Sequence, residues 1–476
     1  MNDNSTLMAV AAPEIDFDVS VGPVKALHGV NNAPLRIPEG SRQDEFRAAG
    51  IPYVRTHDTA GMWGGAHYVD IPNVFPDFDA DENDPASYDF AFTDAYLRPL
   101  VEAGCEPFYR LGVTIENYWR VKAYNIYPPK DFAKWARICE HVVRHYNEGW
   151  ANGFSWGLTY WEIWNEPENP PMWQGTREQY FELYRVAATH LKACFPGIKV
   201  GGYGGCGFYA VDDPEKKADA FFAGFVTWFE DFVKFVQAPE TKCPLDFYSW
   251  HLYVDGQWTI RRIAVHAAYV RRVLDEAGLA AAESIFNEWN VFSSWAHCGF
   301  DAIKEPPVAA GVAAAFALMQ DGPVDKAMYY DALPSRAYCG LFYFPSCATT
   351  PTYEAFRAFN VLYRLGNAVK VSGCPDDIFA CAAEGGGDKA VLLSNIGGKT
   401  VQLLPQLKGA AGAVFKLYRL DETHRGLDFC GEWREGDRLT LSGNAFALLS
   451  TRDLVAPTSP SSPVRALNGI ESQRRS

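Results

Sequence analysis

Strand-like and helix-like segments alternate along most of the chain, and this alternation restricts the fold more than any other feature. Eight short, apolar and β-prone runs occur, each followed by a helical periodicity or a long loop. Eight strand–helix repeats are what a (β/α)8 TIM barrel requires. The strand-like runs cover residues 24–31, 51–58, 105–113, 158–166, 198–205, 245–253, 283–290 and 325–333.

The segments between these runs carry the 3.6-residue period of amphipathic helices. A doubly wound open sheet is the main competitor, but it needs a Gly-rich phosphate turn after its first strand, and "LHGVNN" does not supply one. "GGYGGCG" is glycine-rich, but no helical pattern begins directly after it. The sequence therefore favours an α/β fold with a (β/α)8 barrel. The predicted helices cover residues 129–148, 176–195, 218–236, 259–278, 308–322 and 352–366.

The pattern of apolar and polar residues changes along the chain and divides it into further parts. We expect the barrel to cover residues 24–366, because from 367 the pattern changes to short alternating runs separated by Gly and Asp. This pattern predicts a small accessory β-sandwich over 367–453. Residues 1–23 contain the alternating "IDFDVSVGP", which we expect to add a strand to that sandwich. Residues 454–476 are rich in Pro and Ser and are predicted to be a mobile tail.

Composition excludes several classes of partner. The net charge of −15 argues against nucleic acid or an anionic membrane surface. No stretch approaches the length and apolarity of a membrane-spanning helix. The 11 cysteines are odd in number, contain no CxxC and suit reduced thiols, and the first residues lack the basic region of a secretory signal. We therefore expect a cytoplasmic protein, and the sequence is compatible with a homo-oligomer.

Polar side chains gather where the predicted barrel strands end, which is the active face of such a barrel. A single residue at a strand end also fits the cap of the next helix, but the set as a whole indicates a site. Its members are His28, Asn31, Arg55, His57, Asp58, Arg110, Asn165, Glu166, Tyr203, His251, Tyr253, Glu288, Tyr330 and Asp331.

Two members of the set are glutamates that follow an asparagine, Glu166 in "WNEP" and Glu288 in "FNEW". Their strands are the fourth and the seventh, so their carboxylates are predicted to face each other across the barrel mouth. Two carboxylates that flank a bond are the arrangement that breaks a glycoside. Glu162 shares the side of the strand with Glu166, but Glu166 lies at the mouth and Glu162 lies deeper.

"WEIWNEPE" and "IFNEWN", with "VRTHD" upstream and "SWHLY" between them, resemble glycoside hydrolase family 39 of the retaining clan A. The resemblance covers about residues 24–365. It implies that Glu166 is the acid/base, that Glu288 is the nucleophile and that Asn165 hydrogen-bonds the sugar 2-hydroxyl. Many relatives have Thr before the second glutamate where this chain has Asn287, which leaves the role intact and the subgroup open.

Other strand-end residues are candidates for binding the substrate. Tyr253 is expected to hydrogen-bond the nucleophile, and His251 the sugar or the acid. Arg55 either pairs with Glu288 and holds it ionised or pairs with a different acid in the barrel core. His57, His28 and Tyr330 point to the same site. Trp289 and Trp119 are candidate walls for a sugar ring, and core packing explains them equally well.

The leading hypothesis is thus an exo-acting retaining glycosidase without a cofactor or metal, most of all a β-D-xylosidase acting on a small oligosaccharide or glycoside. Galactosides, arabinosides and iduronides remain alternative substrates. A non-catalytic carbohydrate-binding barrel is expected to lose at least one of the two glutamates. A metal-dependent hydrolase predicts His-x-His at the end of the first strand, and "LHGVN" lacks it. The acidic "DFDADEND" (77–84) fits solvated acids better than a calcium loop, because it lacks that loop's Gly and terminal Glu.

Overall fold

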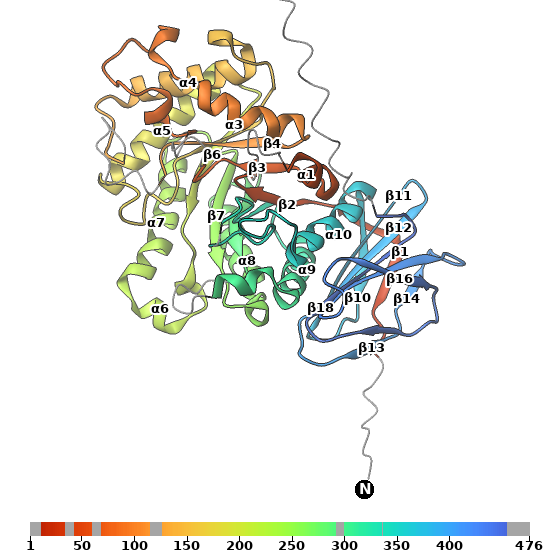
Figure 1. The fold of residues 1–476 in the computed structure, drawn as a ribbon. Helices are drawn as coiled ribbons and strands as arrows, with labels where there is room; N and C mark the ends of the chain where they lie inside the picture. The colour runs from red at the N-terminus through yellow and green to blue at the C-terminus, as the bar shows by residue number, and fades with distance from the viewer. Residues whose placement is uncertain are drawn as a thin grey trace, which may run out of the picture.

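The computed structural model describes residues 11–33, 42–59, 68–114, 126–291, 299–335 and 337–454. Two parts are visible in Figure 1, a closed barrel ringed by helices and a β-sheet domain beside helices α9 and α10. The fold class expected from the sequence is therefore confirmed. Trp119 lies outside the described residues, as do the predicted tail from residue 455 onward and the first ten residues.

All eight predicted barrel strands are present, and neighbouring strands pair in parallel until β9 closes on β2. Several are shorter than predicted. The clearest case is β5, which ends at Ile163, because Trp164 and Glu166 have left-handed backbone conformations (φ 75° and 43°). The barrel strands are β2 (Ala26–Asn31), β3 (Tyr53–Arg55), β4 (Glu106–Leu111), β5 (Tyr160–Ile163), β6 (Lys199–Gly205), β7 (Phe247–Tyr253), β8 (Glu283–Asn290) and β9 (Lys326–Tyr329).

The six predicted helices are also present, and the structure adds others. The sequence pattern missed α1, which has only seven residues, and α3, which contains Pro99. The α-helices are α1 (Gln43–Ala49), α2 (Ile71–Val74), α3 (Ala91–Glu102), α4 (Phe132–Glu148), α5 (Arg177–Cys194), α6 (Pro214–Ala218), α7 (Ala220–Gln237), α8 (Arg262–Glu276), α9 (Pro306–Asp321) and α10 (Pro351–Leu365). Short 3-10 turns are η1 (Pro85–Ser87), η3 (Trp150–Asn152), η4 (Tyr209–Val211), η5 (Gln257–Thr259) and η7 (Gly299–Lys304).

The β-domain consists of an eight-stranded sheet and a two-stranded sheet, β13 with β17. Strand β1, from the N-terminal part of the chain, pairs antiparallel with β10 and parallel with β14. The strands are β1 (Glu14–Pro23), β10 (Asn367–Ser372), β11 (Ile378–Gly385), β12 (Asp388–Asn395), β13 (Val401–Leu403), β14 (Gln406–Lys408), β15 (Phe415–Leu420), β16 (Asp428–Trp433), β17 (Leu439–Leu441) and β18 (Ala445–Ser450).

The centre of the large sheet is buried on both faces. Ala380 and Ala382 of β11 join the core of the β-domain, whereas Cys381 and Ala383 join the core that continues into the barrel helices. A strand covered on both faces reads as a continuous apolar run, which explains "IFACAA". The Ser394 hydroxyl also donates to the Ala310 carbonyl of α9 at 2.7 Å. The β-domain is thus packed directly on the barrel.

Below the barrel mouth, the interior is filled by a compact apolar layer of five buried side chains: Phe108, Tyr160, Phe247, Ile285 and Met328. This layer keeps water out of the barrel and forms a floor under the strand ends. Among the described residues, no helix combines the length and apolarity needed to cross a membrane.

Candidate active site

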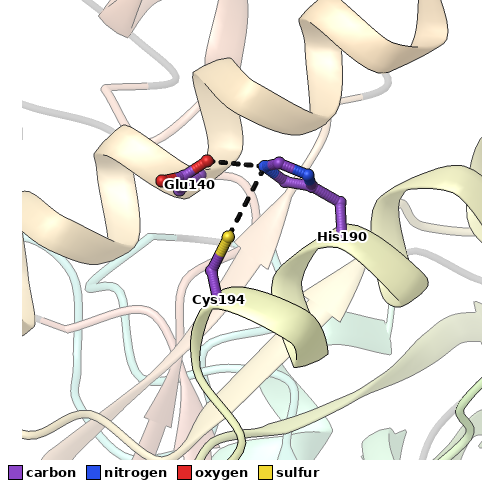
Figure 2. A group of neighbouring side chains, drawn as sticks. All are labelled: Glu140, His190 and Cys194. Carbon is purple, nitrogen blue, oxygen red and sulfur yellow. Dashed lines mark hydrogen bonds and ion pairs between the residues drawn. The ribbon is translucent and has the colours of Figure 1, made fainter.

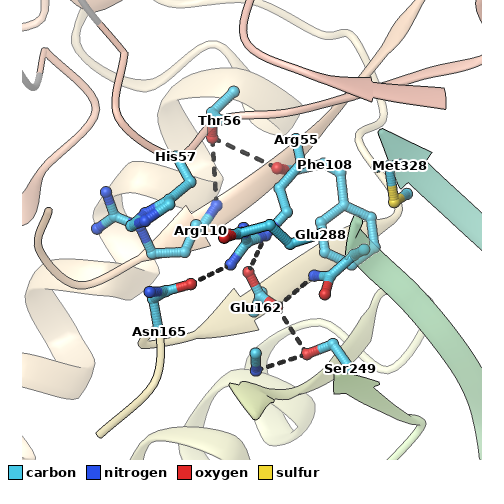
Figure 3. Close-up of polar contacts among 12 residues, drawn as sticks. Arg55, Thr56, His57, Phe108, Arg110, Glu162, Asn165, Ser249, Glu288 and Met328 are labelled. Carbon is cyan, nitrogen blue, oxygen red and sulfur yellow. Dashed lines mark hydrogen bonds and ion pairs between the residues drawn. The ribbon is translucent and has the colours of Figure 1, made fainter. Parts of the chain in front are cut away.

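The side chain of Arg55, at the end of β3, lies at the centre of the polar residues in the barrel mouth (Figure 3). Its guanidinium donates to Glu162 at 2.8 Å, to Glu288 at 2.9 Å and to the Asn165 side-chain oxygen at 2.5 Å. A fourth bond reaches the side-chain oxygen of Asn31 at 3.1 Å. Both alternatives considered for Arg55 are therefore realised, because it pairs with Glu288 and also with a deeper acid.

Glu288 lies on β8 and keeps 10% of its side chain exposed. One carboxylate oxygen accepts from Arg55, and the other accepts from the Tyr253 hydroxyl at 2.7 Å. Burial is the main reason that the pKa of Tyr253 is raised well above its usual value, and the charge of Glu288 adds to it, so the phenol stays a donor. These two donors hold the Glu288 carboxylate in one orientation.

Glu166 follows β5 and has its backbone in the left-handed region. Its N–H donates to the carbonyls of Tyr203 and Gly204 on β6, at 3.1 and 3.0 Å, which fixes this turn to the neighbouring strand. One carboxylate oxygen lies 2.7 Å from Nδ1 of His251, and the other accepts from the Asn169 amide at 2.9 Å. The side chain is 14% exposed, so it reaches the open mouth.

The two carboxylates lie close to each other and share a neighbour. His251 Nδ1 is 2.7 Å from Glu166 and 3.7 Å from Glu288, and side-chain oxygens of the two glutamates lie within 4.8 Å of one another. A carboxylate spacing of about 5–5.5 Å suits direct attack by one of them, whereas about 6.5–9.5 Å leaves room for a water. The arrangement therefore fits a covalent, double-displacement reaction.

The electrostatic surroundings of Glu166 act in opposite directions. Burial raises its pKa, but the hydrogen bond and charge of His251, the Asn169 amide and the charge of Arg55 outweigh burial, so the pKa lies below its ordinary value. Glu166 and His251 are joined by one hydrogen bond of 2.7 Å. The imidazole thus lies directly beside the Glu166 carboxylate.

The glycine-rich segment of β6 provides room for this network. Gly204 has φ +63°, and a Cβ there would lie 3.0 Å from Arg55 Nη2, 3.1 Å from Asn165 Oδ1 and 3.1 Å from His251 Nε2. A Cβ on Gly201 would lie 2.1 Å from the Phe247 carbonyl oxygen. The run "GGYGGCG" is therefore explained by close packing around the site and not by phosphate binding.

A second group of polar side chains lies at the ends of β3 and β9. The Tyr330 hydroxyl donates to Asp58 at 2.7 Å, and His57 Nε2 lies 3.4 Å from the other oxygen of Asp58. The adjacent Asp331 is buried and accepts from the Asn32 amide at 3.2 Å. Burial raises the pKa of Asp331 to about 8, so it is largely protonated at neutral pH. Tyr330 and His57 thus lie with other strand-end groups, one layer outside Arg55.

Two of the proposed binding residues are not brought to the site. Trp289 is fully buried, stacks on Phe286 and meets Phe316 of α9 edge-on, because alternate residues of β8 face the helices. His28 is also fully buried and packs against Phe359 and Tyr363 of α10. The core interpretation of Trp289 is therefore correct, and the expectation that His28 faces the site is wrong.

Sequence reasoning underestimated Glu162. Its carboxylate is fully buried under Arg55 and also accepts from Ser249 at 2.6 Å and from Asn287 at 2.5 Å. The departure at Asn287, seen in the sequence only as a subgroup marker, is thus a hydrogen bond to this carboxylate. The even spacing between Glu162 and Glu166 already placed both on one side of the strand.

Two of the five acids of residues 77–84 pair with nearby basic side chains, and the other three accept hydrogen bonds from neighbouring amides. Asp79 pairs with Lys130, and Glu82 pairs with Lys134 and Arg137. Asp81 accepts from the backbone and side-chain amides of Asn83. Glu82 is buried, so the expectation of solvated acids does not hold for it.

The chain is an eight-stranded barrel with paired glutamates at its mouth, and comparisons show which known proteins it resembles. Residues 46–277, just under half of the chain, match the model of the glycosyl hydrolases family 39. A β-xylosidase of Geobacillus stearothermophilus is 29% identical over 215 residues, which cover 43% of this chain and 36% of that protein. These matches show that the chain is similar to glycoside hydrolase family 39. The alignment spans only about a third of that curated relative.

Solved structures show the same fold over almost the whole chain. A glucosidase from Croceicoccus marinus superposes with a TM-score of 0.75 at 22% identity, covering 93% of this chain and 98% of that one. A monomeric β-xylosidase from Caulobacter crescentus CB15 gives 0.67 at 18% identity, with 93% and 99% covered. At these identities the likeness concerns the fold.

Proposed function

We propose that this protein is a retaining glycosidase in which Glu288 is the nucleophile and Glu166 the acid/base. The observation that carries the proposal is the approach of the two carboxylates to within 4.8 Å across the barrel mouth, each with its own hydrogen-bond donors. The match of residues 46–277 to the model of the glycosyl hydrolases family 39 supports the same assignment.

In the first step, Glu288 attacks the anomeric carbon and Glu166 protonates the leaving glycosidic oxygen. The bond between carbon and the leaving group breaks as the ester bond to Glu288 forms. Arg55 and Tyr253 hold the Glu288 carboxylate oriented for attack. The proton comes from the Glu166–His251 pair, whose members are 2.7 Å apart.

In the second step, Glu166 acts as a base. It removes a proton from a water molecule, the water oxygen bonds to the anomeric carbon, and the ester to Glu288 breaks. The lowered pKa of Glu166 favours the carboxylate form that this step requires. Two displacements at one carbon retain its configuration.

Asn165 is suited to bind the sugar 2-hydroxyl. Its side-chain oxygen accepts from Arg55, which can only donate, so the orientation of the amide is fixed. The amide nitrogen is left to donate to the substrate. Such a bond strengthens as positive charge develops on the ring in the transition state.

We favour a β-D-xyloside as substrate, on the resemblance to proteins described as β-xylosidases. The same pair of glutamates would serve a galactoside, an arabinoside or an iduronide. The buried position of Trp289 removes it as a stacking wall, so among the candidate residues that the structure describes, the polar groups Asn165, His251, His57 and Tyr330 are left to recognise the sugar.

Activity on a panel of aryl glycosides, with retained or inverted product determined by NMR, tests the proposal. Glu288→Ala is expected to lose activity on every substrate by at least about a hundredfold. Glu166→Ala is expected to lose less on a substrate whose leaving group needs no proton, and added azide should restore turnover by replacing the base-activated water. Inverted product, or near-normal turnover in both variants, would refute the pair assignment.

A further inference from the structure

Three side chains with metal-binding atoms meet on the outer helices of the barrel, away from the mouth (Figure 2). Glu140 comes from α4, and His190 and Cys194 come from the last turns of α5. His190 Nε2 lies 2.5 Å from a Glu140 oxygen and 3.8 Å from the Cys194 sulfur. One atom of each residue lies within 4.8 Å of the other two. Among the described residues, only the active-site glutamates with His251 form another such group.

The spacing of these atoms is close to that around a tetrahedral zinc ion. Zinc bonds of about 2.0 Å to nitrogen and oxygen and about 2.3 Å to sulfur place the nitrogen about 3.3 Å from the oxygen and about 3.5 Å from the sulfur. The observed 2.5 and 3.8 Å lie on either side of these values. His190 and Cys194 are four residues apart, so both side chains leave α5 on one face. Small side-chain rotations therefore suffice.

The surroundings already orient the carboxylate. Arg144 holds the other oxygen of Glu140 at 2.7 Å, as second partners of metal-bound carboxylates commonly do. Arg144 also pairs with Glu148, so two carboxylates offset its positive charge. All three candidate ligands are partly exposed, which leaves a path for an ion to enter and a position for water.

We propose that Glu140, His190 and Cys194 form a zinc-binding site that joins α4 to α5. A carboxylate, an imidazole and a thiolate suit zinc better than calcium or magnesium, which prefer oxygen ligands. The carboxylate and the thiolate together balance the charge of the ion, and water completes the coordination. Because the site lies on the outer helices, its role is structural and distinct from the reaction at the barrel mouth.

Binding exchanges protons for the metal in a balanced way. The Cys194 thiol loses its proton to solvent as the sulfur–zinc bond forms. Nε2 of His190, which donates to Glu140, gives up its proton as the ring takes the tautomer protonated at Nδ1, and the freed Nε2 lone pair binds the metal. No electron is transferred. Because the thiol must lose its proton to bind the ion, binding should tighten as pH rises.

The test uses the full chain after treatment with a chelator, titrated with Co²⁺ as a coloured substitute for Zn²⁺. We expect one equivalent to give an intense thiolate-to-cobalt absorption band, with visible bands of tetrahedral intensity, and Zn²⁺ to displace both. Cys194→Ser should abolish the thiolate band, and His190→Gln should weaken binding at least tenfold.

Cys430→Ser is the matched control, because Cys430 is another partly exposed thiol, on β16, and its loss should leave the band unchanged. Cobalt bound at Glu166, His251 and Glu288 would give no thiolate band, since that group has no sulfur. Absence of the band in the parent protein, or a band that survives Cys194→Ser, would overturn the proposal.

Discussion

Glu162 and Glu288 lie on two sides of one guanidinium, at 2.8 and 2.9 Å from Arg55. Glu162 is fully buried and Glu288 is slightly exposed, so Arg55 connects an inner carboxylate to the one at the barrel mouth. Arg55 keeps its proton, so its positive charge interacts with both carboxylates at once. The position of the Glu288 carboxylate thus depends on Glu162, which is fully buried below the barrel mouth.

We predict that Glu162→Gln lowers kcat/KM about 10- to 100-fold, because the amide cannot accept from all of Arg55, Ser249 and Asn287 as the carboxylate does. Breaking a buried ion pair should also lower the free energy of unfolding by about 3–5 kcal/mol. Steady-state kinetics and urea unfolding measure the two effects.

Glu283→Gln is the control for this prediction. Glu283 pairs with Lys199 and Lys326 at the opposite end of β8. The Glu283→Gln substitution should lower the free energy of unfolding without changing kcat/KM of the folded protein. Equal kinetic losses in both variants would contradict a positioning role for Glu162.

Gly204→Ala is expected to lower kcat/KM at least about tenfold. The added methyl would meet Arg55, Asn165 and His251 at 3.0–3.1 Å, and the left-handed backbone at φ +63° adds strain for any residue with a Cβ. Gly224→Ala on α7 is the matched control, since its Cβ meets nothing within 4 Å. A Gly204→Ala protein with normal kinetics would show that the network tolerates displacement.

His251→Asn should move the high-pH limb of kcat/KM to higher pH while lowering its maximum. Asparagine keeps a neutral donor near Glu166 but removes the positive charge, which helps to hold the pKa of Glu166 below its usual value. Without that charge the pKa rises, so the acid stays protonated to higher pH. Tyr253→Phe alters a contact with Glu288 only and should leave the limb in place. An unmoved limb in His251→Asn would contradict this account.

Acid sensitivity should depend on His28. Burial lowers its pKa from 6.5 to about 3, so below pH 6.5 the unfolded chain binds a proton that the folded protein does not. The stability is fully present above pH 6.5 and falls by up to about 1.4 kcal/mol per pH unit toward pH 3. His28→Phe should remove this slope in denaturant unfolding. His141→Gln, at a partly buried ring on α4, should not.

Much of the fold was predictable because it depends on local patterns. The eight barrel strands and the six long helices follow from apolar runs and helical periodicities, which are visible within a short stretch of the sequence. The missed helices show the limit of this approach. Helix α1 has only seven residues, which is too short for its periodicity to be recognised in the sequence. Helix α3 contains Pro99, which disfavours a helix in the sequence pattern, but packing stabilises this helix nevertheless.

The site was predictable in part. Glu166, Glu288, Arg55, His251 and Tyr253 lie together because strand ends of a parallel barrel meet on one face. The direction of each side chain was harder to predict from the sequence. Strands β8 and β2 turn Trp289 and His28 toward the helices. The pleat alone sends neighbouring residues to opposite sides, and only the register of the closed barrel decides which side is the interior.

By itself, the sequence determined the barrel, the accessory β-domain and the two glutamates, because periodicity and strand-end position are local properties. The tertiary structure alone decided how these charges are connected: Arg55 between Glu162 and Glu288, His251 between the two glutamates at the mouth, and Glu140 beside His190 and Cys194 on the outer helices. These contacts join residues from different strands and helices, which are far apart in the sequence. Their distances follow from barrel closure and helix packing, which no local pattern specifies.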